Sequence, residues 1–368
     1  MSRPLSEVLK WTETDPDSAR IDGLVARLAD EDGRADDIEG WPAALWELIE
    51  KSGTTRWSLP SEFGGESCPR PLLVQRYAQL ATGSLTAVFI LSQHDAGVRR
   101  LVDARANPTA THWLHEIGAG RAFVTVGISH LTTSRRLGAQ PATAALVAPG
   151  SFRLDGAIPW VTAAERADLL VTGAVLADGQ KLLVALPTNR PGVVVRPPFS
   201  LAALQASCTT EVLLEGVQVD GSDLLAGPAS DVMPQTGAVG TAGLETSALA
   251  LGQAHAALRA LTEIAPAQTE LAEPLELLCD NWQTLWKQLV AQARGDSGAV
   301  PSAQIRSAAN TLVLRSTQAY LTVTKGTGFL RTEPAQRWAR QALFFLVWSC
   351  PTPVAHAAIR DLVGLCQV

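Results

Sequence analysis

LDGAIPWVTAAERADLLVTGA, residues 154–174, is the stretch that decides the fold expected of this chain. Its opening predicts a strand with a turn at Asp155 and Gly156, and the apolar run LLV predicts a second strand. Trp160 and Thr162 stand between them, and side chains two residues apart on a strand share one face. An indole and a hydroxyl on one face would form half of a site for a flat heteroaromatic ligand; the alternative is a core Trp beside a solvated Thr.

The composition indicates a large globular protein. The chain has 368 residues, 46% hydrophobic and 18% charged, enough for one large core or for separate domain cores. Its net charge of -6 argues against nucleic acid or an anionic membrane as a partner. The N-terminus shows no apolar leader, and no apolar run reaches the roughly 18 residues of a membrane span, so we expect no membrane span and a cytoplasmic location.

The cysteines and histidines give no sign of a disulfide framework or a metal site. The five cysteines are scattered and odd in number, without the paired spacing of zinc ligands. His112 and His115 lie three residues apart, but no second pair completes a ligand set. We therefore expect no bound metal.

The remaining patterns divide the chain into three domains. Apolar residues at helical spacing dominate residues 1–122, and short strand-like runs between Gly, Pro and Asp turns dominate residues 123–230. Long Ala- and Leu-rich segments fill residues 231–368, and antiparallel helices joined by short loops make a bundle. The prediction is an α+β multidomain fold with an N-terminal all-α domain, a middle β-barrel or sandwich domain and a C-terminal four-helix bundle.

Several stretches, in this order, resemble motifs of the acyl-CoA dehydrogenase family. WSLPSEFGG, from Trp57, resembles the family's P-x-E-x-G-G connection. IPWVTAAERAD resembles K-x-W-I-T-N-x-x-x-A-D, with Ile158 in place of the Lys and Ala163 in place of the Asn. LETSALALGQAHAALRALTEI resembles a-a-x-x-l-G-x-A-x-a-A-l, with Gly252 at the matching Gly. The resemblance implies this family's fold and a flavin-dependent oxidoreductase.

By this resemblance, FAD would lie between the β-domain and the C-terminal bundle. Trp160 would pack against the isoalloxazine ring, and Thr162 would bond to its reactive nitrogen. ISHLTTSRR, residues 128–136, corresponds to the family's T-E-P-x-x-G-S-D, and TVTKGTGF is a reduced form of Q-x-x-G-G-x-G-Y. The resemblance thus assigns cofactor binding to Ile128, Ser129, Ser134, Trp160, Thr162 and Gly326. The family's R-x-x-F-G motif has no counterpart, and FMN is the alternative cofactor.

The family's catalytic carboxylate is missing from its common position. Aligning Arg337 and Arg340 with the family's e-R-x-x-R-D-A places Ser349 where the Glu stands, and Ser is no base near neutral pH. The family's other location for the carboxylate aligns near Ala242, so Glu245, about one helical turn further on, is the candidate base. The alternative is that Glu245 is only a carboxylate favoured by the helix dipole. Asp231 and His255 are the other candidates.

Three functions are compatible with these residues. The first is α,β-dehydrogenation of an acyl thioester with hydride transfer to FAD, for which the sequence does not indicate the electron acceptor. The second is a flavin monooxygenase or oxidase similar to the dibenzothiophene monooxygenase branch of this fold, which needs no carboxylate base. The third is a non-catalytic paralogue that serves as a partner subunit. The resemblance also implies a homodimer or homotetramer.

Overall fold

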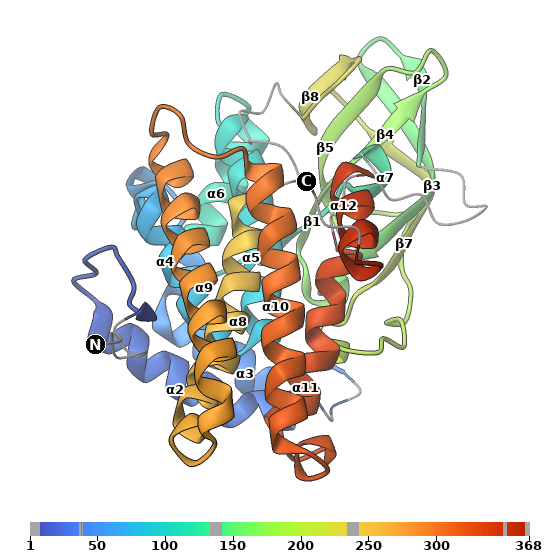
Figure 1. Cartoon of the computed structure of the whole chain (residues 1–368). Coiled ribbons are helices and arrows are strands. Elements are labelled where there is room, and N and C mark those ends of the chain that lie inside the picture. The colour runs from blue at the N-terminus through green and yellow to red at the C-terminus, as the bar shows by residue number, and fades with distance from the viewer. Residues whose placement is uncertain are drawn as a thin grey trace.

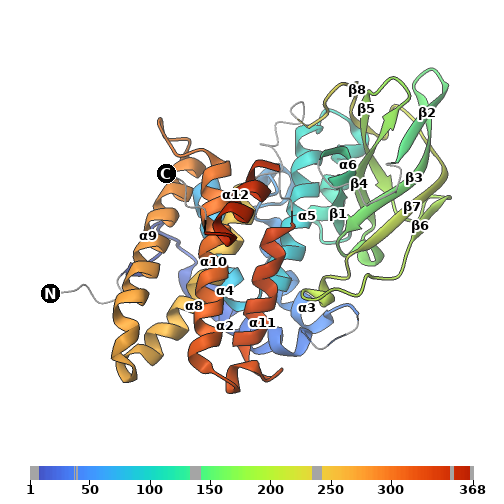
Figure 2. The ribbon, with the colours of Figure 1, turned by 45° about the vertical axis from the view of Figure 1, so that its right-hand side comes forward.

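The computed structural model describes residues 8–36, 38, 40–132, 142–233, 243–348 and 352–364. N-terminal helices are followed by a central sheet and by C-terminal helices, and the sheet lies to one side of the helices (Figure 1, Figure 2). The fold class expected from the sequence is therefore confirmed. The domain boundaries near residues 122 and 230 stay predictions. Within the described residues, no helix has the length and hydropathy that crossing a membrane requires.

Helices come before and after the strands of the sheet in the sequence. Those before the sheet are α2 (Ser18–Ala35), α3 (Ala43–Ser52), α4 (Arg70–Gly83), α5 (Leu85–Asp103) and α6 (Pro108–Gly118). The short α7 (Ser129–Thr132) lies between two strands. Those after the sheet are α8 (Leu244–Ile264), α9 (Ala272–Arg294), α10 (Ser302–Thr324), α11 (Pro334–Ala342) and α12 (Thr352–Leu362).

The strands of the described residues form one eight-stranded sheet. They are β1 (Val124–Gly127), β2 (Thr143–Ala148), β3 (Ser151–Val161), β4 (Leu169–Leu176), β5 (Lys181–Pro187), β6 (Val193–Val195), β7 (Thr210–Val219) and β8 (Leu224–Ala229). The order is β6-β7-β3-β2-β4-β5-β8, and β1 pairs in parallel with β4. The turn expected at Asp155 and Gly156 is wrong, because β3 continues through both residues. Gly156 instead lies at a shift of register against β7, with a φ of +120°, as in a β-bulge.

The close packing of α4 against α8 forms the centre of the helical part. Every residue of α8 from Leu244 to Leu258 is buried, as expected of a helix surrounded by protein on all sides. α8 has no side chain at Gly252, where a Cβ would lie 2.1 Å from the carbonyl oxygen of Ala78 and 2.8 Å from Cβ of Ala81. Gly252 therefore lets the two backbones approach each other.

Replacing Gly252 with Ala is expected to destabilise the protein, because the backbone of α4 would have to move away. Overpacking of this kind costs about 1–3 kcal/mol, more than the roughly 1 kcal/mol that Ala gains over Gly in a helix. Urea denaturation followed by circular dichroism measures the free energy of unfolding. Gly23→Ala in α2, where an added Cβ meets nothing within 4 Å, is the matched control and should be neutral or stabilising. Equal stability of the two variants would contradict this packing.

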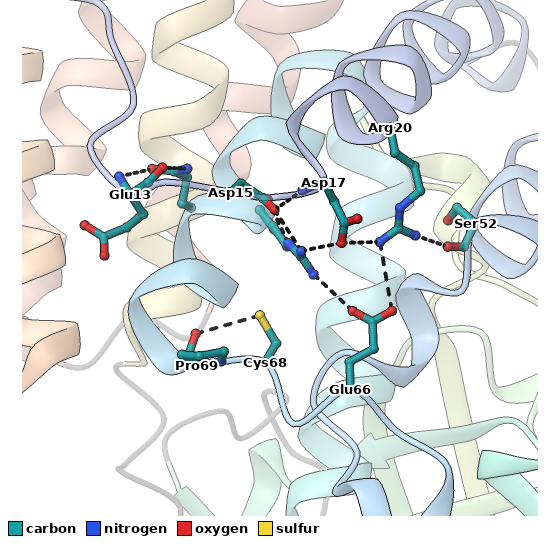
Figure 3. Close-up of polar contacts among 10 residues, drawn as sticks. Glu13, Asp15, Asp17, Arg20, Ser52, Glu66, Cys68 and Pro69 are labelled. Atoms are coloured by element: carbon teal, nitrogen blue, oxygen red, sulfur yellow. Dashed lines mark hydrogen bonds and ion pairs between the residues drawn. The ribbon is translucent and has the colours of Figure 1, made fainter.

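Residues 9–15 form a segment without helix or strand that contacts α4, α8 and α9, and we call it the N-terminal strap. Gln75 on α4 binds both backbone groups of Glu13: its Oε1 accepts from the amide at 2.8 Å, and its Nε2 donates to the carbonyl at 2.8 Å. The neighbouring Arg76 is buried and donates to both carboxylate oxygens of Asp15, at 2.8 and 2.9 Å. Figure 3 shows the acidic residues that pair with Arg76, which are Asp15, Asp17 and Glu66.

Aromatic side chains hold the other end of the strap on α8 and α9. Trp11 stacks on the ring of His255, with centroids 4.5 Å apart, and meets Trp282 and Trp286 edge-on. Nε2 of His255 lies 3.0 Å from the carbonyl oxygen of Leu9. Burial lowers the pKa of His255 to about 4. The strap is therefore seated against a neutral imidazole.

The pKa of His255 predicts a loss of stability in mild acid. Below about pH 6.5 the unfolded chain takes up a proton that the folded chain accepts only near pH 4, so the stabilisation by neutral His255 is complete above pH 6.5 and falls toward pH 4. His255→Gln keeps a donor for Leu9 and does not titrate. Its free energy of unfolding, measured with urea between pH 4 and 6.5, should depend less on pH than that of the wild type. His356→Gln, at an exposed position on α12, should show the same pH dependence as the wild type. The prediction would be refuted if His255→Gln also kept the pH dependence of the wild type.

Two arginines attach α11 to the rest of the molecule. Nε of Arg337 donates to Asp32 of α2 at 2.8 Å, and both side chains are buried. Arg340 pairs with Asp36 and donates to the carbonyl oxygen of Ala202 at 3.1 Å. The second bond reaches the loop between β6 and β7, so α11 contacts both the N-terminal helices and the sheet domain.

Candidate functional site

Trp160 and Thr162 lie at the end of β3 in different surroundings. β3 ends at Val161, and Trp160 has a φ of +60°, a left-handed conformation rare for a bulky residue. Trp160 is 47% exposed, whereas Thr162 is only 2% exposed. The sequence suggested that the two side chains share one face of a regular strand, and in the structure they do not. The chain instead places an exposed indole next to a buried hydroxyl.

A second aromatic ring stands beside Trp160. The ring of Phe199 lies 5.1 Å from that of Trp160, at an interplanar angle of 59°. Phe199 belongs to the loop before η4 (Gln205–Ser207); its amide donates to the carbonyl of Thr209 at 2.9 Å, and its own carbonyl accepts from Nε2 of Gln205 at 3.0 Å. The two rings, which we call the aromatic corner, meet at an angle, and the exposed face of the Trp160 indole suits an aromatic ligand. No sequence pattern singled out Phe199.

Thr162 is the first of three buried hydroxyls that contact one another. Its Oγ1 lies 3.1 Å from Oγ1 of Thr209, which lies 2.9 Å from Oγ of Ser207. The backbone around them is also fixed: Thr125 donates to the carbonyl of Thr162 at 2.8 Å, and the amide of Ala163 donates to the carbonyl of Ser207 at 3.0 Å. This hydroxyl chain (Thr162, Thr209 and Ser207) joins the end of β3 to the start of β7.

The other residues assigned to the cofactor lie in separate places. Ile128 joins β1 to α7, and Ser129 is the first residue of α7; Oγ of Ser129 donates at 3.1 Å to the carbonyl of Pro159, the residue directly before Trp160. Gly326 lies in an exposed turn after α10, with open space beside it. Ser134, like Ala242 and Ser349, lies outside the described residues. The cofactor roles of these residues stay predictions.

Glu245, the candidate base, is buried at the start of α8 between two arginines. Its Oε1 lies 2.5 Å from Nη1 of Arg70 on α4 and 3.3 Å from Nη1 of Arg99 on α5. Burial by itself would raise the pKa of Glu245, but the two guanidinium groups outweigh it and lower that pKa to about 2. A general base works best with a pKa near the operating pH. These surroundings favour an ion-pair role for Glu245, and its role as a base stays a prediction.

The remaining candidate bases differ in their surroundings. Oδ1 of Asp231 accepts from the amide of Met233 at 3.0 Å. His255 contacts Leu9 and Trp11 of the N-terminal strap. Sequence patterns missed a further carboxyl, Asp95 on α5, which is fully buried and accepts from the hydroxyls of Tyr77 and Ser58. Burial raises the pKa of Asp95. The helical part therefore contains a second carboxyl whose pKa is shifted in the opposite direction.

Aromatic residues hold the segment that leads to Ser349. Phe89 on α5 lies 4.9 Å from the rings of both Phe344 and Trp348. Arg306, buried on α10, donates to the carbonyl of Trp348 at 2.8 Å. The backbone just before the family's usual carboxylate position is thus fixed by packing and by one charged donor. Across the described ranges, no group of three or more His, Cys, Asp or Glu side chains is arranged to hold a metal.

Glu245→Gln tests the ion-pair role. Because the change leaves two arginines without their buried carboxylate, we expect a loss of about 1.5–3 kcal/mol in the free energy of unfolding at pH 7. The pKa of Glu245 lies below its usual 4.5, so this contribution is complete above about pH 4.5 and is lost toward pH 2. The difference from the wild type should therefore shrink below pH 4.5.

Urea denaturation at several pH values measures this difference. The control is Glu47→Gln, which breaks the exposed pair with Lys51 and should leave the free energy of unfolding nearly unchanged, because solvent screens exposed ion pairs. Unchanged stability of Glu245→Gln at pH 7 would contradict the ion-pair role and favour the hypothesis that Glu245 is the catalytic base.

No family model matches the sequence. The chain is 24% identical over 243 residues to the probable acyl-CoA dehydrogenase YngJ of Bacillus subtilis (strain 168), a match covering 64% of this chain and 63% of the relative, just under two thirds of its length. It is 23% identical over 274 residues to benzylmalonyl-CoA dehydrogenase of Aromatoleum aromaticum, covering 73% and 71% of the two chains.

Solved structures resemble the whole chain. Butyryl-CoA dehydrogenase from Megasphaera elsdenii superposes with a TM-score of 0.81 at 16% identity, over 96% of this chain and 100% of that chain. Nitrososynthase from Micromonospora carbonacea superposes with a TM-score of 0.74 at 18% identity, over 98% of each chain. Helices, sheet and helices in this order therefore define an acyl-CoA dehydrogenase fold. In sequence the chain is similar to acyl-CoA dehydrogenases at 23–24% identity, and in fold it is similar to solved members of that family, one of which is described as an FAD-dependent dehydrogenase.

Proposed function

We propose that this chain is a flavin-dependent oxidoreductase that dehydrogenates the α and β carbons of an acyl thioester. The aromatic corner beside the hydroxyl chain is the observation that carries the proposal. An exposed indole with an adjacent ring fits one face of a flat ring system, and a buried hydroxyl fits a nitrogen at its edge. Bound FAD would supply the hydride acceptor. Both curated relatives carry names of CoA-ester dehydrogenases, which supports this substrate class.

The residues of this chain would bind and orient the ring and shield it from water. Trp160 would cover the ring, and the Thr162 hydroxyl would donate to its edge. Ser129 holds the backbone directly before Trp160 through the carbonyl of Pro159. Gly326 would contribute to the phosphate-bearing half of FAD; because the motif around it is reduced, FMN is the alternative cofactor.

A second function is favoured by the surroundings of Glu245. Removal of an α-proton needs a base, and a carboxylate with a pKa of about 2, held by two arginines, accepts protons poorly at neutral pH. A flavin monooxygenase or oxidase needs no such base. The similarity to nitrososynthase is consistent with a reaction other than thioester dehydrogenation on this fold. A non-catalytic partner subunit is the third alternative.

The apolar run at residues 343–348 bears on the expected homodimer or homotetramer. Phe345 is fully buried in the helical core, whereas Leu343 is 50% and Val347 71% exposed. The run therefore supplies both core contacts and an exposed apolar surface. We propose self-association through this surface.

Flavin content and its response to thioesters separate the three functions. We expect purified protein, reconstituted with excess FAD, to retain flavin that loses its absorption band anaerobically when acyl-CoA esters are added. Trp160→Leu should weaken flavin binding, whereas Trp338→Leu, which removes an indole packed on Tyr320, should not. Bound FMN or FAD that ignores thioesters would support the oxygen-dependent alternative. Failure to bind either flavin would leave only the partner subunit.

A further inference from the structure

The hydroxyl chain contains one more proton than its own contacts use. Thr162, Thr209 and Ser207 each carry one O–H proton and can accept through oxygen lone pairs. Their two contacts, of 3.1 and 2.9 Å, use two protons. Among the described residues, these hydroxyls bond only to one another, so one buried O–H has no acceptor there. A buried donor without a partner is costly, and a ligand bound beside the hydroxyl chain would supply the acceptor.

The surroundings decide which end of the chain holds this proton. Ser207 is fully enclosed, and its backbone amide and carbonyl are both occupied, by Leu204 and Ala163. Thr209 lies in the middle, next to both other hydroxyls. Thr162 lies two residues from the exposed Trp160, so it is the end that a bound ring can approach. If Ser207 donates to Thr209 and Thr209 donates to Thr162, the hydroxyl proton of Thr162 is the one without an acceptor.

We infer that Thr209 and Ser207 are positioning residues, which orient the Thr162 hydroxyl so that it donates to a ring nitrogen of the flavin. The inference rests on the proposed flavin binding and concerns residues for which no motif assigned a role. By donating to Thr162, Thr209 occupies one lone pair of that oxygen and leaves its proton to point outward. A hydroxyl that already accepts a hydrogen bond is also a stronger donor, because hydrogen bonds in a chain polarise one another.

Variants of the middle residue test this orientation. Thr209→Val keeps the shape and removes the hydroxyl, and it should weaken FAD binding about tenfold, equivalent to the ~1.4 kcal/mol of one hydrogen bond. It should also shift the absorption band of the bound flavin, which a purely structural role would not do. Thr209→Ser restores the hydroxyl and should bind FAD as the wild type does. Ser207→Ala leaves the bond from Thr209 to Thr162 intact and should have a smaller effect.

A double-mutant cycle with Thr162→Val completes the test, with fluorescence titration of FAD as the measurement. If Thr209 acts through Thr162, then Thr209→Val should change neither affinity nor spectrum further in the Thr162→Val background. Additive effects, or normal affinity and spectrum in Thr209→Val, would overturn the inference while leaving the proposed function in place. A wild-type protein that binds neither FAD nor FMN would overturn both. Flavin binding without thioester oxidation would still allow the cycle to decide.

Discussion

The short distance between α4 and α8 is the constraint on which the other contacts depend. Gly252 brings α8 against the backbone of Ala78, and this separation lets side chains on α4 reach partners that the C-terminal helices bring near. Arg70, at the start of α4, reaches Glu245 at the start of α8. One turn further along α4, Gln75 holds the strap that also lies against His255 of α8. A missing side chain on one helix thus sets the position of charges and of the N-terminal segment.

The fold could be predicted from the sequence because its signals are local and ordered. The motif around Trp160 and the small-residue pattern of α8 each lie within one stretch, and their succession along the chain indicated the family. The candidate site could be predicted only in part. Thr209 follows Thr162 by 47 residues, and their contact depends on shifts of register between β3 and β7 that no periodicity announces. The left-handed conformation of Trp160 was equally hidden, because it is rare for a bulky residue.

Glu245 illustrates a different limit of sequence patterns. Alignment places a carboxylate near the family's alternative base position, but its protonation depends on which charges surround it after folding. Arg70 and Arg99 come from α4 and α5, and their combined attraction exceeds the effect of burial. Asp95 forms no ion pair among the described residues, and burial outweighs the attraction of His94 and Arg99, so its pKa is shifted upward. Two acids in neighbouring helices thus differ because of partners far away in sequence.

The N-terminal strap also constrains the order in which the chain can fold. Leu9 contacts His255 across 246 positions of sequence, and Thr12 contacts Trp286 across 274. A ribosome releases the strap first and the helices that receive it more than two hundred residues later. During that interval Gln75 and Arg76 of α4 have been synthesised, but the aromatic partners of Trp11 on α8 and α9 have not. Strap docking is therefore a late event in synthesis, and a chain that stops before α9 leaves Trp11 without its indole partners.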